Sequence, residues 1–148
     1  MTLADELSQI STIFIDTAPI IYYIEAHPQF GPLAKEVVDS FQSEKINAFS
    51  SVITLTEVLP KPIEAGDEKL ARKFADFLQY GKKLDLIEIS AAIAERAGRL
   101  RGQYPDLRAL DAIQLSTALD VGADAFLTND KKLKQVKEIK VMVLKEYL

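Results

Sequence analysis

Two acidic residues follow segments of the sequence that are expected to be buried strands. Asp16 comes directly after the apolar run Thr12–Ile15, and Asp130 comes three residues after the apolar run 123–127. Short apolar, β-branched runs are typical of buried strands. Because ligands bind at the carboxyl ends of strands in open parallel sheets, we expect both carboxylates to point from the same edge of one sheet.

Two further acids lie within almost wholly apolar sequence. Glu57 is seven residues after Ser50, in the early turns of an expected helix and so near the positive end of the helix dipole. Asp111 has Ala-Leu before it and Ala-Ile after it. A carboxylate is costly to bury unless it is paired or binds a cation. Together with the two acids at the strand ends, Glu57 and Asp111 therefore suggest one shared cation site.

Each of these acids also has a simpler structural interpretation. Asp16 could cap the helix that follows it, and Asp130 could cap the lysine-rich helix after it. Glu57 and Asp111 could lie on exposed edges of their helices. These four interpretations would all have to hold at once, and they explain the local sequence less well than a common metal site does.

The donor set predicts the metal and the chemistry. Oxygen ligands without His or Cys suit Mg²⁺ or Mn²⁺ rather than a structural zinc. One or two such ions could activate a water molecule and stabilise charge on a phosphodiester. The chain contains no cysteine and a single histidine, His27, which precedes a proline and is interpreted as a turn residue.

Strand-like and helix-like segments alternate along the chain, which predicts an α/β/α sandwich with a mainly parallel central sheet. The expected strands are residues 12–15, 46–49, 84–89, 123–127 and 141–144. The expected helices follow Asp16, Pro32, Ser51, Asp67, Ser90, Asp106 and Asp130. Pro60 and Pro62 are expected to stop the helix that carries Glu57. With no repeat or linker in sight, we expect one domain over residues 1–148.

The bulk composition is that of a globular protein, with a net charge of −4. Residues 131–148 hold six lysines and two glutamates, a local charge of +4 that leaves −8 on the rest. That segment is either a solvated lysine-rich face or a basic flank beside an acidic centre. No apolar run approaches the length of a membrane span, and the N-terminus does not resemble a signal peptide, so we expect a cytoplasmic protein.

Four segments, one around each acid, resemble in order and spacing the four motifs of PIN-domain nucleases. The segments are Phe-Ile-Asp-Thr-Ala-Pro-Ile-Ile (14–21), Ser-Val-Ile-Thr-Leu-Thr-Glu-Val-Leu (51–59), Ala-Leu-Asp-Ala-Ile-Gln-Leu-Ser-Thr-Ala-Leu (109–119) and Ala-Phe-Leu-Thr-Asn-Asp-Lys-Lys-Leu (125–133). In length the chain is similar to VapC-type toxins of toxin–antitoxin pairs. The resemblance implies a PIN-like fold and a metal-dependent endoribonuclease, commonly a homodimer, held inactive by a small antitoxin.

The resemblance assigns metal-site roles to Asp16, Glu57, Asp111 and Asp130, with Thr128 as a supporting hydroxyl near Asp130. Two arginines near the third motif, Arg99 and Arg108, could contact RNA phosphates, although solvated helix faces are the simpler explanation. Tyr22, Tyr23 and Tyr104 could stack on bases or pack in the core.

Three other functions are alternatives to a metal-dependent ribonuclease. Ala18 stands where a haloacid-dehalogenase pattern needs a second aspartate, and the first strand lacks the acid pair of a response-regulator receiver. Those phosphoryl-transfer classes are excluded. A PIN nuclease for RNA processing or DNA structures remains open. So does a non-catalytic module that binds RNA or a protein partner.

Overall fold

A five-stranded parallel sheet forms the centre of the molecule. The computed structural model describes residues 1–148. Its strands are β1 (Thr12–Ile15), β2 (Asn47–Ser51), β3 (Leu84–Ile87), β4 (Ala125–Thr128) and β5 (Lys140–Val143). They lie in the order β3, β2, β1, β4, β5, and every neighbouring pair is parallel. The predicted α/β/α sandwich is confirmed, and its sheet is parallel throughout.

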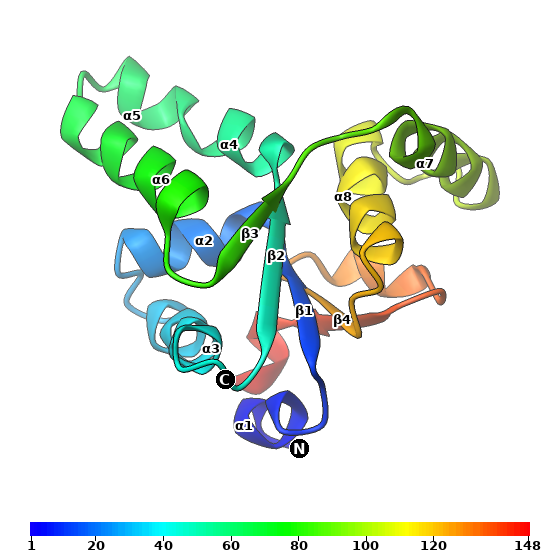
Figure 1. Ribbon diagram of the computed structural model, residues 1–148, viewed down its shortest axis with the longest axis horizontal. Helices are drawn as coiled ribbons and strands as arrows, with labels where there is room; N and C mark the ends of the chain where they lie inside the picture. The colour runs from blue at the N-terminus through cyan, green and yellow to red at the C-terminus, as the bar shows by residue number, and fades with distance from the viewer.

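Helices cover both faces of this sheet (Figure 1). They are α1 (Leu3–Leu7), α2 (Thr17–Ile24), α3 (Gly31–Gln42), α4 (Val52–Val58), α5 (Pro60–Glu64), α6 (Glu68–Tyr80), α7 (Ala91–Gln103) and α8 (Ala109–Asp120), with 3₁₀ helices η1 (Lys131–Gln135) and η2 (Leu144–Tyr147). No helix has the length and apolarity needed to cross a membrane. The helices α1, α5 and η2 were not predicted from the sequence. Pro60 does follow the end of α4 but also begins α5, since proline is tolerated in a first helical turn.

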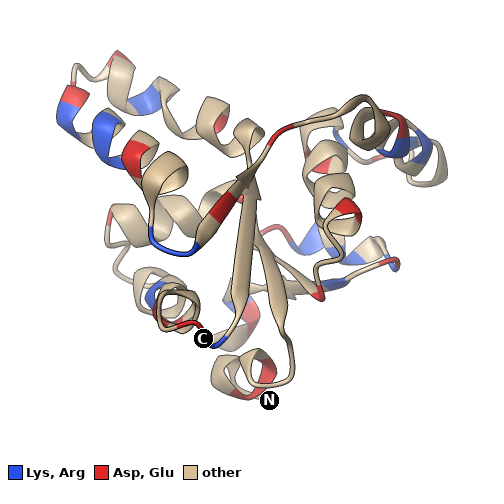
Figure 2. Cartoon of the chain, viewed as in Figure 1, with Lys and Arg blue, Asp and Glu red and all other residues tan.

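Alternation along β1 divides the interior into two cores. Ile13 and Ile15 face a core built with α1, α2, α3 and α6, whereas Phe14 faces the core built with α7, α8 and η1. Successive side chains of a strand point to opposite faces, and here both faces are covered. Phe14 stacks on Phe126 of β4, with ring centroids 5.4 Å apart. The central strands carry almost no charge, whereas the edge strand β3 carries an acidic residue (Figure 2).

The strand order creates a crevice next to β1. From β1 the chain builds β2 and β3 on one side, and it later builds β4 and β5 on the other. β1 and β4 are therefore the neighbours whose onward connections run in opposite directions. In open α/β sheets this switch point, at the carboxyl ends of the strands, is where ligands bind. Asp16 and Asp130 follow the two strands that flank it.

Candidate active site

Asp16 lies at the carboxyl end of β1, held from two sides. Its backbone N–H donates to the carbonyl of Leu127 at 2.9 Å, which ties the end of β1 to β4. The Thr128 hydroxyl donates to Asp16 Oδ2 at 2.9 Å. Asp16 occupies the N-cap position of α2, but its side chain makes no capping hydrogen bond. The capping interpretation of Asp16 is therefore not what the structure shows.

The surroundings of Asp16 disfavour its negative charge. Burial raises the pKa of Asp16 to about 6, and the negative charges of Asp111 and Glu57 add to the increase. The Thr17 backbone N–H and the Thr128 hydroxyl act in the opposite direction. No Lys or Arg side chain pairs with Asp16. A half-buried carboxylate that two other acids face and no cation neutralises is a strong cation-binding position.

Asp111 lies in the first turn of α8, which begins later than the sequence suggested. The N-cap residue is Arg108, not Asp106, so Asp111 is close to the positive end of the helix dipole. Arg108 Nε donates to Asp111 Oδ2 at 2.9 Å. The Asp111 side chain is 15% exposed and that of Arg108 is 77% exposed. Asp111 is thus largely covered, and the exposed Arg108 pairs with it at the cleft that both residues line.

Asp130 and Asp111 face the same cleft. This cleft has a volume of about 570 Å³ and is also lined by Arg108 and Lys132. Asp130 Oδ1 accepts from the backbone N–H of Lys132 at 3.0 Å and so caps η1. The capping interpretation of Asp130 is therefore correct, but the same side chain also borders the cleft. Lys132 supplies a basic flank beside the two acids, as one interpretation of the lysine-rich segment expected.

Glu57 contacts Thr17, the residue after Asp16, and does not line the cleft of Asp111 and Asp130. The expectation that it sits in the first turns of its helix is wrong, because α4 starts at Val52 and Glu57 is its penultimate residue. The residue is exposed. Its Oε1 accepts from the Thr17 hydroxyl at 2.6 Å, and it borders a separate cleft with Lys61. Its charge still acts on Asp16, which places it at the same edge of the sheet.

The acids are neighbours, but they do not form a closed ligand set. No three acidic side chains are grouped as a metal ion would require. Asp111, Asp130 and Glu57 are instead turned toward protein donors from Arg108, Lys132 and Thr17. Mutual repulsion between like charges favours this arrangement. The shared cation site of these acids stays a prediction, to which their oxygen-only donor chemistry is suited.

A layer of buried polar side chains, which the sequence motifs did not predict, lies beneath Asp16. Ser50, Ser51, Thr54 and Gln114 are all at most 1% exposed. Hydrogen bonds join them across β2, α4 and α8. One signal was available in the sequence, since Gln114 is three residues after Asp111 and so lies on the same helical face.

Of the remaining candidate contacts, Arg99 and Tyr104 lie apart from the acids, whereas the Tyr22 hydroxyl accepts from Asn129 Nδ2 at 3.1 Å, next to Asp130. Arg99 is on α7, 3.4 Å from Glu95, and borders another cleft. The Tyr104 hydroxyl donates to Glu138 at 2.6 Å, so that ring is fixed on the α7 side. Tyr22 packs against Phe30, with centroids 5.0 Å apart.

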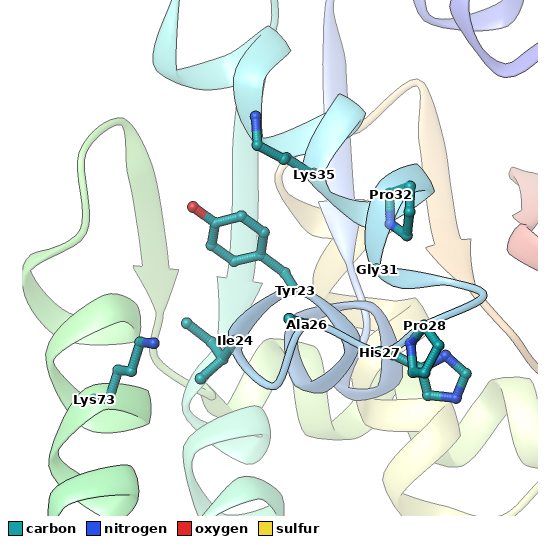
Figure 3. Close-up of a pocket in the computed structure, with 9 residues that line it drawn as sticks. All are labelled: Tyr23, Ile24, Ala26, His27, Pro28, Gly31, Pro32, Lys35 and Lys73. Carbon is teal, nitrogen blue, oxygen red and sulfur yellow. The ribbon is translucent and has the colours of Figure 1, made fainter.

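A second cavity, of about 550 Å³, lies between α2, α3 and α6. Figure 3 shows Tyr23, Lys35 and Lys73 bordering it from these three helices, and none of the four acids lines it. His27 is at its rim, where Nδ1 accepts the backbone N–H groups of Gln29 and Phe30 at 3.1 and 3.0 Å. The interpretation of His27 as a turn residue is confirmed.

Removing the charge of Arg108 is expected to strengthen the binding of Mn²⁺ and to remove a contact with RNA. Arg108→Gln is expected to tighten Mn²⁺ binding by about 2- to 5-fold, the value of a solvent-exposed ion pair that no longer competes for Asp111. The same change is expected to lower the slope of log affinity against log salt for single-stranded RNA by about 0.7, the loss of one phosphate contact. Calorimetry measures the Mn²⁺ affinity, and RNA binding at several salt concentrations measures the slope.

Arg99→Gln is the matched control for the metal measurement, because Arg99 pairs with Glu95 and with none of the four acids. Its Mn²⁺ affinity should equal that of the wild type. Unchanged or weaker Mn²⁺ binding by Arg108→Gln would show that Arg108 does not compete with a cation.

The fold is thus an open parallel α/β/α sandwich with an acidic centre at its switch point, where no Lys or Arg side chain pairs with Asp16. A family model described as PIN domain matches residues 13–139. The chain belongs to the PIN domain family, as the four sequence motifs predicted. Among curated proteins, no sequence matches this chain significantly.

Solved structures of toxin–antitoxin proteins share this fold over nearly their whole length. VapBC2 from Rickettsia felis, bound to a promoter DNA fragment, has a TM-score of 0.73 at 20% identity, covering 89% of this chain and 98% of that one. A toxin–antitoxin complex from Klebsiella pneumoniae has a TM-score of 0.66 at 25% identity, covering 89% and 97%. VapC20 from Mycobacterium tuberculosis, described as a sarcin-ricin loop cleaving toxin, has 0.69 at 17% identity, covering 87% and 98%. These neighbours are similar to the chain in fold.

Proposed function

We propose that this protein is a Mg²⁺- or Mn²⁺-dependent endoribonuclease, formed by a single PIN domain over residues 1–148. Asp16 carries the proposal: it is half-buried at the switch point, its pKa is raised to about 6 by burial and by neighbouring acids, and no basic side chain pairs with it. Such a group favours a bound cation over an isolated charge.

Asp16, Glu57, Asp111 and Asp130 are the proposed ligands of one or two ions. A bound Mg²⁺ or Mn²⁺ would supply an activated water and offset charge on a phosphodiester. Thr128 keeps Asp16 Oδ2 in place through its hydroxyl. Arg108 is exposed beside the cleft, and Lys132 lines it, so both can meet RNA phosphates. Arg99, on α7, is a more distant candidate for the same backbone.

We further propose that the protein acts as the toxin of a toxin–antitoxin pair in the cytoplasm. The family and the toxin–antitoxin fold neighbours support this assignment. The expected partners are an RNA substrate, a small antitoxin protein and a second copy of this chain in a homodimer. A PIN nuclease of RNA processing is the alternative that the same site would serve.

Cleavage of a mixed RNA pool by purified protein tests the enzymatic proposal. Cuts are expected with Mg²⁺ or Mn²⁺ and not with EDTA. Wild-type protein that neither binds Mn²⁺ in calorimetry nor cuts any RNA would contradict it and favour a binding module. Expression in growing cells tests the toxin role, since growth arrest relieved by a co-expressed small partner is expected. Cleavage without growth arrest would favour RNA processing.

A further inference from the structure

Gln114 connects three elements of the fold directly beneath Asp16. It lies on α8 and is 1% exposed, although it carries a polar amide. Its Oε1 accepts from the Ser51 hydroxyl of β2, and its Nε2 donates to Thr54 Oγ1 of α4 at 2.7 Å. The same Nε2 lies 3.5 Å from Asp16 Oδ1 at the end of β1. A buried amide is costly unless its polar atoms are bonded, and here they are.

The Ser51 side of this network fixes the amide oxygen. Ser51 Oγ accepts the backbone N–H of Ile53 at 3.1 Å, which leaves its single hydrogen for another acceptor. That acceptor is the Gln114 side chain. Only the oxygen end of an amide can accept, so Oε1 must face Ser51 and Nε2 must face the other way.

The Thr54 side of the network fixes the amide nitrogen. Ser50 Oγ lies 2.9 Å from the carbonyl oxygen of Ile15, which can only accept, so the Ser50 hydrogen goes there. Thr54 Oγ1, 3.0 Å from Ser50 Oγ, then donates its own hydrogen to Ser50. Its lone pairs are left for one N–H of Gln114, and the second N–H of that amide faces Asp16.

The two oxygens of Asp16 therefore meet donors of different strength. Thr128 donates to Oδ2 at 2.9 Å, a full hydrogen bond, whereas Gln114 Nε2 is 3.5 Å from Oδ1, at the long end of the range. The long contact places an amide N–H beside Oδ1 without saturating this oxygen. Oδ1 thus keeps the capacity to bind another positive group.

We propose that Gln114 is a positioning residue, whose amide orients the Asp16 carboxylate and turns an N–H, not an oxygen, toward it. This inference rests on the proposed function, in which the oriented Asp16 carboxylate is a metal ligand. Gln114 itself is buried and contacts neither the cleft nor RNA. It acts only through Asp16.

Two substitutions at Gln114 test this role. Gln114→Met keeps the length of the side chain but has no N–H for Asp16, and Gln114→Leu also removes the amide. Both are expected to weaken Mn²⁺ binding about 10-fold, the low end for groups that orient metal ligands, and to lower kcat on RNA similarly. The KM for RNA should stay unchanged, since Gln114 does not contact substrate. All measurements are made well below the Tm of each variant.

Ser116→Ala is the matched control, because Ser116 is a fully buried hydroxyl on the same helix without a hydrogen-bond partner. It should leave Mn²⁺ affinity and kcat at wild-type values. If the Gln114 variants have a lower Tm but wild-type Mn²⁺ affinity and kcat, the residue is only structural and the inference is overturned.

Thr54→Val provides a second path if the Gln114 variants do not fold. It removes the acceptor of the amide without touching Asp16 and is expected to weaken Mn²⁺ binding about 3-fold, the value of one hydrogen bond. Wild-type affinity in this variant would also overturn the inference. A wild-type protein that binds no Mn²⁺ and cuts no RNA would contradict the proposed function itself. Normal wild-type activity with unaffected variants contradicts only the role of Gln114.

Discussion

Asp16→Asn is expected to lower the rate of RNA cleavage by about 10²- to 10³-fold, the usual cost of losing one group that stabilises charge at a reaction centre. Asp16 is the acid that the other charged groups of the site surround, and Thr128 orients one of its oxygens. The amide of asparagine keeps the shape but brings no negative charge to a cation. Mn²⁺ binding should weaken about 10-fold or more.

Single-turnover cleavage of RNA at saturating Mn²⁺ measures this loss, and calorimetry measures the affinity. Asp120→Asn is the matched control, since that aspartate is exposed at the end of α8, away from the switch point. It should cleave like the wild type. Full activity of a correctly folded Asp16→Asn protein would remove Asp16 from the mechanism.

The same substitution is expected to make the protein more stable at neutral pH. The Asp16 pKa is about 6 in the folded protein, against 3.8 for the free side chain, chiefly because of burial. The folded state therefore binds the proton more tightly than the unfolded state does. Wild-type stability falls as the pH rises through this window, by about 1–3 kcal/mol, allowing for the partial exposure of the group. Asparagine has no charge to bury and avoids this loss.

Urea unfolding in EDTA at several pH values checks the prediction. The free energy of unfolding of Asp16→Asn should exceed that of the wild type by about 1–3 kcal/mol near pH 7.5. The pH-dependent part of this difference should vanish only near about pH 3, below both pKa values of Asp16, where the carboxyl is protonated in the folded and in the unfolded state. Asp120→Asn should show no such pH-dependent gain. A pH-independent difference between Asp16→Asn and wild type would mean that the Asp16 charge is not the cause. Added Mn²⁺ should stabilise the wild type more than the variant.

Most of the framework could be predicted because its signals are local. The apolar run Thr12–Ile15 and the capping residues Ser51, Asp67 and Ser90 identified elements that the structure contains. Errors arose where the local signal was ambiguous. Asp106 was predicted to cap a helix, but α8 begins only after Arg108. Asp111 therefore lies in the first turn of α8 and not in the second, as predicted. Glu57 was predicted near the start of its helix but lies near the end of α4.

By itself, the sequence determined that this is an α/β chain of the PIN family with acids after β1 and β4, since strand periodicity and motif spacing are local properties. Only the tertiary structure decided which partner each acid meets. Asp111 is held by an arginine three residues away, whereas Asp16 is approached by Gln114, which is 98 residues distant in the chain. Contacts of the second kind depend on strand order and on helices packing from opposite faces. No local pattern encodes them, because the burial that selects those partners exists only once the sheet is assembled.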